Sequence, residues 1–263
     1  MELSVDGHRV FAATGGRAFD ADQPSMMFVH GAGGDHSVWV LQARYFAHHG
    51  FSVLAVDLPG HGRSDPPALD SVPALADWVL RCLDAAGVDR SALVGHSIGG
   101  LVALEAAARA PERIDALALL AVNFPMAVHD GLLQSAAANE HRALDLINAW
   151  GHSHGAQFGR NRVPGLWMMG GTVRLLERAL EGVIHADLSA AAGYEGGLDS
   201  AARITCPTLL VLGEYDRMTH PKSAQSLADA IGGARVEVLR DCGHMIMDER
   251  PDEALIALIG HFA

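Results

Sequence analysis

The feature that most constrains the fold is a regular alternation of short apolar runs with segments of helical periodicity. Runs this apolar suit strands that are covered on both faces, as in parallel sheets. The alternation predicts an α/β fold with a mostly parallel central sheet flanked by helices. The predicted strands are 26–31, 51–57, 91–95, 114–122, 207–213 and 235–239, and the predicted helices are 39–50, 77–87, 99–110, 223–233 and 253–262.

Two antiparallel edge strands are predicted at the amino-terminal end. The segment ELSVDGHRVFAAT alternates polar and apolar residues around Asp6-Gly7. An Asp-Gly pair flanked by such alternation is a strong hairpin signal. When the two strands of this hairpin are counted, the strand at 114–122 is the sixth in chain order.

The interval from about 125 to 203 interrupts the alternation. It contains helical patterns near 132–149 and 172–185 around GHSHGAQFGRNRVPG, and no convincing strand. A helical insertion between two strands can fold over the carboxyl edge of the sheet, where such folds bind ligands. We therefore predict a core of residues 1–124 and 204–263 with a helical cap, or lid, at 125–203.

The charge balance argues against a nucleic-acid partner. The chain has 19 basic and 31 acidic residues, for a formal charge of -12, whereas phosphate binding depends on clustered Lys and Arg. The segment MELSVDGHRVFAAT lacks the basic start and apolar core of a signal peptide, and no apolar run reaches the length of a membrane span. We expect a cytoplasmic protein that binds no nucleic acid; the sequence does not indicate its oligomeric state.

No metal or organic cofactor is indicated. Cys82, Cys206 and Cys242 have neither metal-type nor C-x-x-C spacing, so we expect reduced, mostly structural thiols. His152 and His154 are interpreted as solvated loop histidines because no further ligand cluster flanks them. The spacings of a dinucleotide site and of a P-loop are also missing.

The segment Gly95-His96-Ser97-Ile98-Gly99 matches the nucleophile elbow G-x-S-x-G. It has the context that this motif requires, with a predicted strand before it and a predicted helix after it. A serine on so tight a turn is held in an unfavourable backbone conformation, and the flanking glycines remove side chains that would collide with neighbouring elements. The pattern predicts Ser97 as a nucleophile at a helix amino terminus.

Five segments at the ends of the predicted strands carry a resemblance to a known family. In chain order they are VHGAGGDHSVW (29–39), DLPGHGRSD (57–65), GHSIGG (95–100), LGEYDRMTHP (212–221) and DCGHMIMDERP (241–251). Over essentially its whole length, the chain resembles the serine hydrolases of the α/β-hydrolase superfamily, in their carboxylesterase and enol-lactonase-like branch. The resemblance implies a Ser-Asp-His triad, an oxyanion hole and no cofactor.

His244 is the predicted base that activates Ser97. A serine hydroxyl is a poor nucleophile until a neighbouring base takes its proton. His244 follows the strand at 235–239 and matches the late histidine of the family. Among the other histidines, His96 is expected to face backbone beside the nucleophile, and His61 lies in a turn that is interpreted as structural.

Asp216 is the predicted acid of the triad. It lies between Ser97 and His244 in the chain and directly follows the strand at 207–213. Glu214 is the nearest competitor, but the resemblance favours the aspartate. The alternative role for Asp216 is to cap a helix that starts near Pro221. Some relatives carry the acid one strand earlier, where this chain has Asn123, which cannot serve as a carboxylate.

The attack on a carbonyl creates an oxyanion, which needs preorganised N–H donors. One donor is predicted to be the backbone N–H of Ile98, directly after the nucleophile. The resemblance places the second on Ala32, in the glycine-rich turn that follows the strand at 26–31. The neighbouring Gly33 remains an alternative for this second donor.

The predicted substrate pocket draws mainly on the insertion. Trp150, Trp167, Met168 and Met169 could line an apolar pocket, and Met245 adjoins the predicted base. Soft methionine and aromatic surfaces adapt to ligands, but the same residues could simply pack the helices of the insertion.

Hydrolysis of a carboxylic ester with small to medium apolar groups is the leading functional prediction. A serine at the elbow excludes the relatives whose reaction needs an aspartate nucleophile there. Hydrolysis of lactones, enol-lactones or thioesters and perhydrolysis stay open. Carbon–carbon bond hydrolysis is less favoured, because the resemblance would then imply a tryptophan where Met245 follows His244. A non-catalytic ligand receptor on the same scaffold is the alternative of another class.

Overall fold

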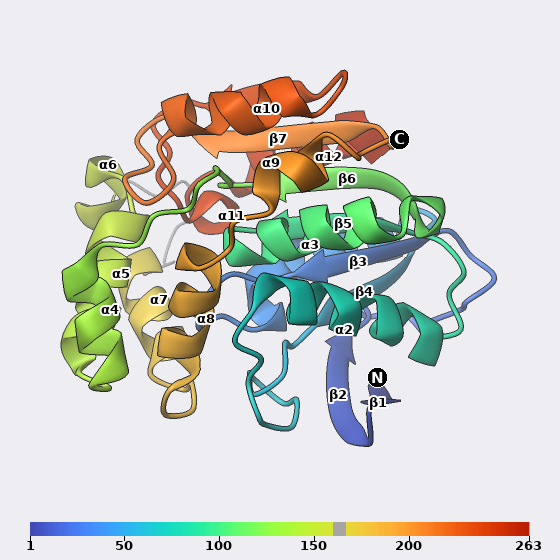
Figure 1. The fold of residues 1–263 in the computed structure, drawn as a ribbon, viewed down its shortest axis with the longest axis horizontal. Coiled ribbons are helices and arrows are strands. Elements are labelled where there is room, and N and C mark those ends of the chain that lie inside the picture. The colour runs from blue at the N-terminus through green and yellow to red at the C-terminus, as the bar shows by residue number, and fades with distance from the viewer. Residues whose placement is uncertain (160–166, 263) are drawn as a thin grey trace.

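The computed structural model describes residues 1–159 and 167–262, which form an eight-stranded sheet flanked by helices (Figure 1). The strand order is β1-β2-β4-β3-β5-β6-β7-β8. Only the pairings of β2 with β1 and with β4 are antiparallel, which confirms the mostly parallel sheet. The strands are β1 (Glu2–Val5), β2 (His8–Ala13), β3 (Ser25–Val29), β4 (Ser52–Val56), β5 (Ser91–His96), β6 (Ile114–Leu120), β7 (Thr208–Gly213) and β8 (Arg235–Leu239).

The central strands are buried on both faces, as their apolar composition predicts. Every residue of β3, β4, β5 and β7 is buried. The amino-terminal hairpin turns at Asp6 and Gly7, whose φ angles are 53° and 82°. Two central turn residues with positive φ are the signature of the tight turn that matches the twist of a hairpin.

Helices cover both faces of the sheet. α2 (Val72–Ala85) and α3 (Ile98–Arg109) contribute to the core on one face, together with α10 (Gln225–Ala230), and α1 (Val40–Ala47) and α12 (Pro251–Phe262) contribute to the core on the other. α2 begins five residues before the predicted start at 77, because Ser71 caps it by accepting a hydrogen bond from Ala74 N. The short helix α11 (Ile246–Glu249) was not predicted.

The helices α4 to α9 lie between β6 and β7 in the chain, and α4, α5, α7 and α8 lie together beyond one end of the sheet (Figure 1). We call them the inserted helices. Their bounds are α4 (Asp130–Ala137), α5 (His141–Gly151), α6 (His154–Gln157), α7 (Met168–Leu176), α8 (Val183–Ala192) and α9 (Gly197–Ala201). No strand occurs at 125–159 or 167–203. Whether these helices act as a lid stays a prediction, and residues 160–165 of the predicted glycine-rich stretch lie outside the described residues.

Both long helical patterns in the insertion prove to be two helices each. Asn139, with φ of 51°, separates α4 from α5, and Gly182, with φ of 80°, separates α7 from α8. A left-handed residue cannot continue a right-handed helix: Asn139 follows the C-cap of α4, and Gly182 is the N-cap of α8. Periodicity alone could not locate the breaks, since the apolar spacing continues across them.

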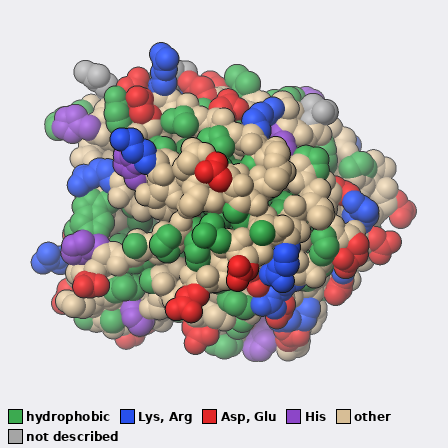
Figure 2. Space-filling model, turned by 45° about the horizontal axis from the view of Figure 1, so that its top comes forward, with side chains coloured by type: hydrophobic (Ala, Val, Ile, Leu, Met, Phe, Trp, Pro, Cys, Tyr) green, Lys and Arg blue, Asp and Glu red, His purple; other side chains and the backbone are tan. Residues whose placement is uncertain are grey.

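The surface is mixed in charge. On the face shown in Figure 2, Lys and Arg side chains are interspersed with Asp and Glu, in keeping with the formal charge of -12. In the described part of the chain, none of the helices has the length and apolar composition needed to cross a membrane.

Candidate active site

Ser97 occupies a strained turn between β5 and α3. Its φ of 55° and ψ of -124° lie in a region that non-glycine residues rarely adopt. A Cβ atom on Gly95 would lie 2.3 Å from Gly99 O, and one on Gly99 would lie 2.3 Å from His30 O. The two glycines of the motif are therefore required by close backbone contacts, which hold Ser97 at the carboxyl end of the sheet.

The structure brings Asp216 and His244 together. Asp216 Oδ2 lies 2.8 Å from His244 Nδ1, and both side chains are almost completely buried. Asp216 Oδ1 accepts hydrogen bonds of 2.8 Å from the backbone N–H groups of Met218 and Thr219. Because Nδ1 faces the carboxylate, its proton is donated there, and Nε2 is left as the atom that can act as a base.

The electrostatics of this pair favour an ionised aspartate. Burial by itself would raise the pKa of Asp216, but the attraction of His244 and the hydrogen bonds from His244 and Thr219 outweigh burial. The pKa of Asp216 is held well below its usual range. The buried carboxylate can therefore stabilise a positive charge on the imidazole of His244.

The alternatives to Asp216 do not fit the geometry. Glu214 is exposed and accepts a hydrogen bond from Asp241 N. The short helix that starts at Pro221 is capped by His220, whose side chain accepts from Lys222 N, so Asp216 is not its cap. Of the two acids considered from the sequence, only Asp216 contacts the His244 ring.

His96 fixes the backbone of the His244 loop. Its Nε2 lies 2.9 Å from His244 O, as expected for a histidine that faces backbone. Burial is the main reason that the pKa of His96 falls to about 3, so its ring is neutral and donates from Nε2. His244 N donates in turn to Gly151 O at 2.8 Å. The loop that carries His244 is thus held from the nucleophile side and from α5.

Residues 31–34 form a tight turn that we call the oxyanion turn. Gly34 N donates to Gly31 O at 3.1 Å, and Gly33 has φ of 64°, the conformation that favours glycine at the third position of such a turn. The Gly33 N–H is already used, because it donates to Asp187 Oδ2 at 2.8 Å. In the described part of the chain, the N–H groups of Ala32 and Ile98 have no protein acceptor. This leaves the Ala32 N–H, and not the Gly33 N–H, available as the second oxyanion donor, and that role stays a prediction.

A cavity of about 240 Å³ is lined by Ser97 and His244 and by the two residues with candidate oxyanion donors, Ala32 and Ile98. It is lined mainly by apolar side chains, with Arg217 and His129 as the charged or titratable exceptions outside the candidate triad. Its lining residues are Ala32, Ser97, Ile98, Met126, Ala127, Val128, His129, Leu132, Trp150, Leu188, Ala191, Arg217, Met218, Thr219 and His244. A smaller cavity of about 60 Å³ also includes Ser97 and His244, and Met245 lines it.

Two of the predicted pocket residues lie at these cavities and the others do not. Trp150 and Met245 line them, but the described lining residues do not include Trp167, Met168 or Met169. Trp167 is 73% exposed, with its ring against Gly170, and Met168 is buried in α7. Whether these three contact a substrate stays a prediction, and the burial of Met168 in α7 fits the alternative that they pack the inserted helices.

Sequence reasoning missed Thr219 and most of the pocket wall. Thr219 Oγ1 lies 2.7 Å from Asp216 Oδ2 and 3.0 Å from Ala121 O, so it orients the carboxylate. A Thr three residues after an Asp is a local signal for such side-chain to backbone turns. Leu132 and Leu188 of the inserted helices carried no comparable signal, because apolar helical residues are equally suited to a core.

His152 was predicted to be a solvated loop residue, and this is wrong. The ring is fully buried, with Nδ1 2.9 Å from Asn148 O and Nε2 3.4 Å from Thr172 Oγ1. The contact with Thr172 of α7 explains the burial, because α7 packs against α5, the helix that His152 directly follows. His154 is exposed, as predicted. The three cysteines are free, as expected.

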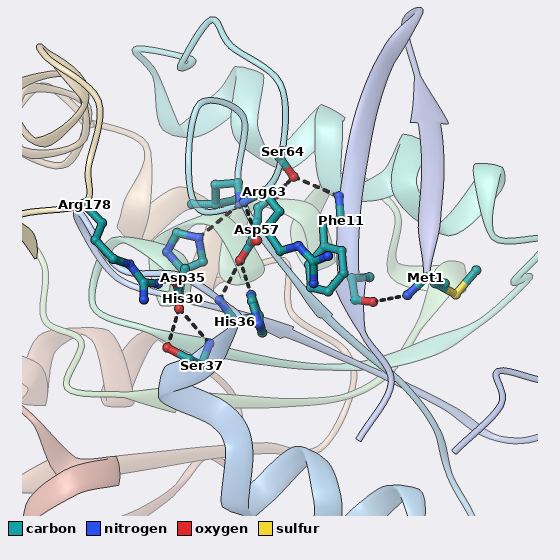
Figure 3. Close-up of polar contacts among 12 residues, drawn as sticks. Met1, Phe11, His30, Asp35, His36, Ser37, Asp57, Arg63, Ser64 and Arg178 are labelled. Atoms are coloured by element: carbon teal, nitrogen blue, oxygen red, sulfur yellow. Dashed lines mark hydrogen bonds and ion pairs between the residues drawn. The ribbon is translucent and has the colours of Figure 1, made fainter. Parts of the chain in front are cut away.

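Asp35, His36 and Asp57 lie close enough to suggest a cation site, but their ligand atoms are occupied (Figure 3). Asp57 Oδ1 accepts from His36 N at 2.7 Å and faces His36 Nδ1 at 2.8 Å, while Oδ2 accepts from Arg63 N at 2.9 Å. Asp35 binds the side chain of Arg178, whose guanidinium supplies the positive charge. The polar atoms of these residues are paired with protein groups, so we propose no metal site here.

The sequence profile of the alpha/beta hydrolase fold matches residues 24–251. The chain belongs to this family. The hydrolase is 33% identical over 248 residues to a putative carbamate hydrolase, RutD, of Pseudomonas savastanoi pv. phaseolicola (strain 1448A / Race 6), which covers 87% of this chain and 89% of that protein.

Two further relatives show the range of functions in the family. The hydrolase is 31% identical over 264 residues to the dihydrolipoyllysine-residue acetyltransferase component of an acetoin cleaving system from Cupriavidus necator. That match covers 95% of this chain but only 65% of the relative's length. The structure of Est816, described as an N-acyl homoserine lactone degrading enzyme, superposes over 100% of both chains with a TM-score of 0.82 and 27% identity.

Proposed function

We propose that this hydrolase cleaves carboxylic esters of small to medium apolar substrates through an acyl-enzyme on Ser97. The observation that carries the proposal is the buried Asp216–His244 hydrogen bond beside a strained serine. A receptor would have no need for a nucleophile held in this conformation next to a base with an ionised partner.

In the proposed reaction, His244 Nε2 takes the proton of Ser97 Oγ as this oxygen attacks the ester carbonyl carbon. The negative charge that develops on the carbonyl oxygen is stabilised by the N–H groups of Ala32 and Ile98. The carbon–oxygen bond to the alcohol then breaks, and His244 returns the proton to the leaving alcohol. Water attacks the acyl-enzyme by the same steps, releasing the acid and restoring Ser97.

The size and walls of the cavity support a small, apolar substrate. The volume of about 240 Å³ lies just below the usual range of about 300–1,000 Å³ for small-molecule sites. Met126, Leu132, Trp150 and Leu188 supply apolar surface, which recognises an acyl or alcohol group by burial. Arg217 also lines the cavity and could pair with an anion. The substrates tested should therefore include an ester whose acyl group carries a second carboxylate.

Lactone hydrolysis is the second candidate. The chemistry is the same, except that the leaving alcohol stays tethered to the acyl group. The 27% identity to Est816 over the whole chain supports it, because that relative is described as degrading N-acyl homoserine lactones.

The test is a panel of p-nitrophenyl esters of increasing acyl length, together with an ester whose acyl group carries a second carboxylate, simple lactones and a carbamate, assayed with wild type and S97A. We expect hydrolysis that is strongest for short to medium acyl groups. S97A should lose activity by several orders of magnitude without losing its fold. A fluorophosphonate probe should label wild type at Ser97 only.

Two outcomes would contradict the proposal. If S97A kept near-normal turnover, the acyl-enzyme mechanism would be wrong. If folded wild type neither reacted with the probe nor hydrolysed any member of the panel, a binding function on a hydrolase scaffold would be favoured instead.

A further inference from the structure

A buried carboxylate of the inserted helices contacts the oxyanion turn. Asp187, on α8, accepts hydrogen bonds at the same oxygen, Oδ2, from Gly33 N and from His61 Nε2, each at 2.8 Å. The side chains of Asp187 and His61 are 1% and 2% exposed. A buried charge without a partner is costly, so this pair ties α8 firmly to the core.

The arrangement around His61 favours a doubly protonated ring. Its Nε2 faces Asp187, and its Nδ1 lies 3.0 Å from Pro59 O, so both ring nitrogens meet acceptors. Burial by itself would lower the pKa of His61, but the charge and hydrogen bond of Asp187 outweigh burial, and the pKa is raised. The charge of His61 in turn helps to lower the pKa of His30, whose ring centroid lies 4.9 Å away, and Asp57 favours the charged form of His61.

A second ion pair joins the inserted helices to the far side of the same turn. Arg178, just after α7, pairs with the buried carboxylate of Asp35, which also accepts from Ser37 N at 2.8 Å (Figure 3). Between the two pairs, Leu176 and Ile184 press on the turn. A Cβ on Gly33 would lie 2.9 Å from each of their side chains. The oxyanion turn is therefore held by α7 and α8 rather than by the core alone.

The Gly33 N–H belongs to the peptide between Ala32 and Gly33, the middle peptide of the turn. Rotation of this peptide changes ψ of Ala32 and φ of Gly33, and such rotations interconvert the common turn types. The bond to Asp187 prevents the rotation in the observed orientation. The Ala32 N–H belongs to the preceding peptide, so a shift of the released turn, rather than the peptide rotation itself, would displace this predicted oxyanion donor.

We propose that Asp187 and Arg178 are positioning residues that hold the oxyanion turn, so that the Ala32 N–H meets the negative charge formed in the reaction. The inference rests on the proposed function, because it assigns a role to the oxyanion hole of that site. Neither residue touches the reacting atoms. Their effect is expected in the stabilisation of the transition state and not in the binding of the uncharged ester.

The experiment compares D187N and R178M with wild type and with D145N, a control that makes the same change at a 65% exposed carboxylate on α5. For D187N we expect kcat to fall about 10- to 100-fold with KM changed by less than about threefold, since loss of a whole oxyanion donor costs about 10²- to 10³-fold. For R178M we expect a loss of a few-fold in kcat. D145N should equal wild type.

A second readout separates positioning from simple loss of folded protein. A trifluoromethyl ketone forms a tetrahedral oxyanion adduct with the active serine, so its inhibition constant should rise by the same factor as kcat/KM falls. Fluorophosphonate labelling of Ser97 should slow in parallel, and this readout needs no ester substrate. Active-site titration corrects kcat for the fraction of competent enzyme.

The outcomes separate this inference from the proposed function. If D187N and R178M, corrected for the competent fraction, match D145N in kcat, inhibition and labelling rate, the positioning role is refuted even though Ser97 hydrolyses esters. If D187N does not fold, R178M carries the test, because Arg178 is 65% exposed and the Asp35 carboxylate that it leaves still accepts a hydrogen bond of 2.8 Å from Ser37 N. Retained activity in S97A would instead refute the proposed function.

Discussion

Asp216 Oδ2 lies 2.8 Å from His244 Nδ1, and Thr219 Oγ1 lies 2.7 Å from the same carboxylate oxygen. The Asp216 carboxylate thus contacts both His244, which becomes charged during the proposed reaction, and the Thr219 hydroxyl, which does not. Three backbone and side-chain donors around Asp216 fix its orientation before any substrate binds. Preorganisation of this kind is a main source of catalytic power in such sites.

Replacement of Asp216 by Asn should lower kcat by about 10³- to 10⁴-fold with little change in the fold, because the amide favours the wrong tautomer of His244. The matched control is E214Q, two residues earlier, whose side chain is exposed and does not contact His244. Steady-state kinetics on one good ester would decide. A large loss in E214Q with a small loss in D216N would reverse the assignment of the acid.

Replacement of Gly99 by Ala should destabilise the protein by several kcal/mol, since the new Cβ would lie 2.3 Å from His30 O and 2.5 Å from Val29 O. Gly171, in α7, is the control because a Cβ there meets nothing within 4 Å. G171A should stabilise the protein by up to about 1 kcal/mol through helix propensity. Urea unfolding measures both changes, and an unaffected G99A would show that the elbow tolerates a side chain there.

Acidification should destabilise the folded protein through His30 and His96. Burial is the main cause that lowers the pKa of His30 to about 4 and that of His96 to about 3. Both are neutral when folded and take up a proton when unfolded below their ordinary pKa of about 6.5. The stability that they contribute is complete above that pH and is lost as the pH falls toward their folded pKa values.

The free energy of unfolding should therefore fall by about 1.4 kcal/mol per pH unit for each of these histidines between pH 6.5 and 5. H96Q keeps an N–H donor for His244 O but removes the titration, so its slope should be shallower by one such contribution. H48Q, at an exposed histidine, should keep the wild-type slope. Urea unfolding at several pH values gives the slopes, and equal slopes for wild type and H96Q would contradict the prediction.

Replacement of Trp150 by Ala should shift the preferred ester toward longer acyl groups, because the indole lines the cavity beside Ser97. W167A is the control, since that side chain is 73% exposed and does not line it. The ratio of kcat/KM for a long and a short p-nitrophenyl ester should rise about tenfold in W150A and stay unchanged in W167A. A change of this ratio in W167A but not in W150A would indicate that the acyl group binds near Trp167 instead.

The sequence by itself determined the order of the strands and of most helices that flank the sheet, and the position of Ser97. The evidence for these is local: apolar runs mark strands that are buried on both faces, and a serine between glycines at a strand–helix junction marks the elbow. The family resemblance placed Asp216 and His244 correctly side by side, because each follows a parallel strand, and the carboxyl ends of such strands meet at one edge of the sheet.

Only the tertiary structure decided which groups around this edge contact one another. The choice between Ala32 and Gly33 depended on Asp187, a residue 154 positions from Gly33 in the chain. The exposure of Trp167 and the burial of His152 likewise depended on how the chain packs around α7. Helical periodicity shows that a face is apolar, but not whether it meets a substrate or another helix, because burial lowers the free energy equally in either case.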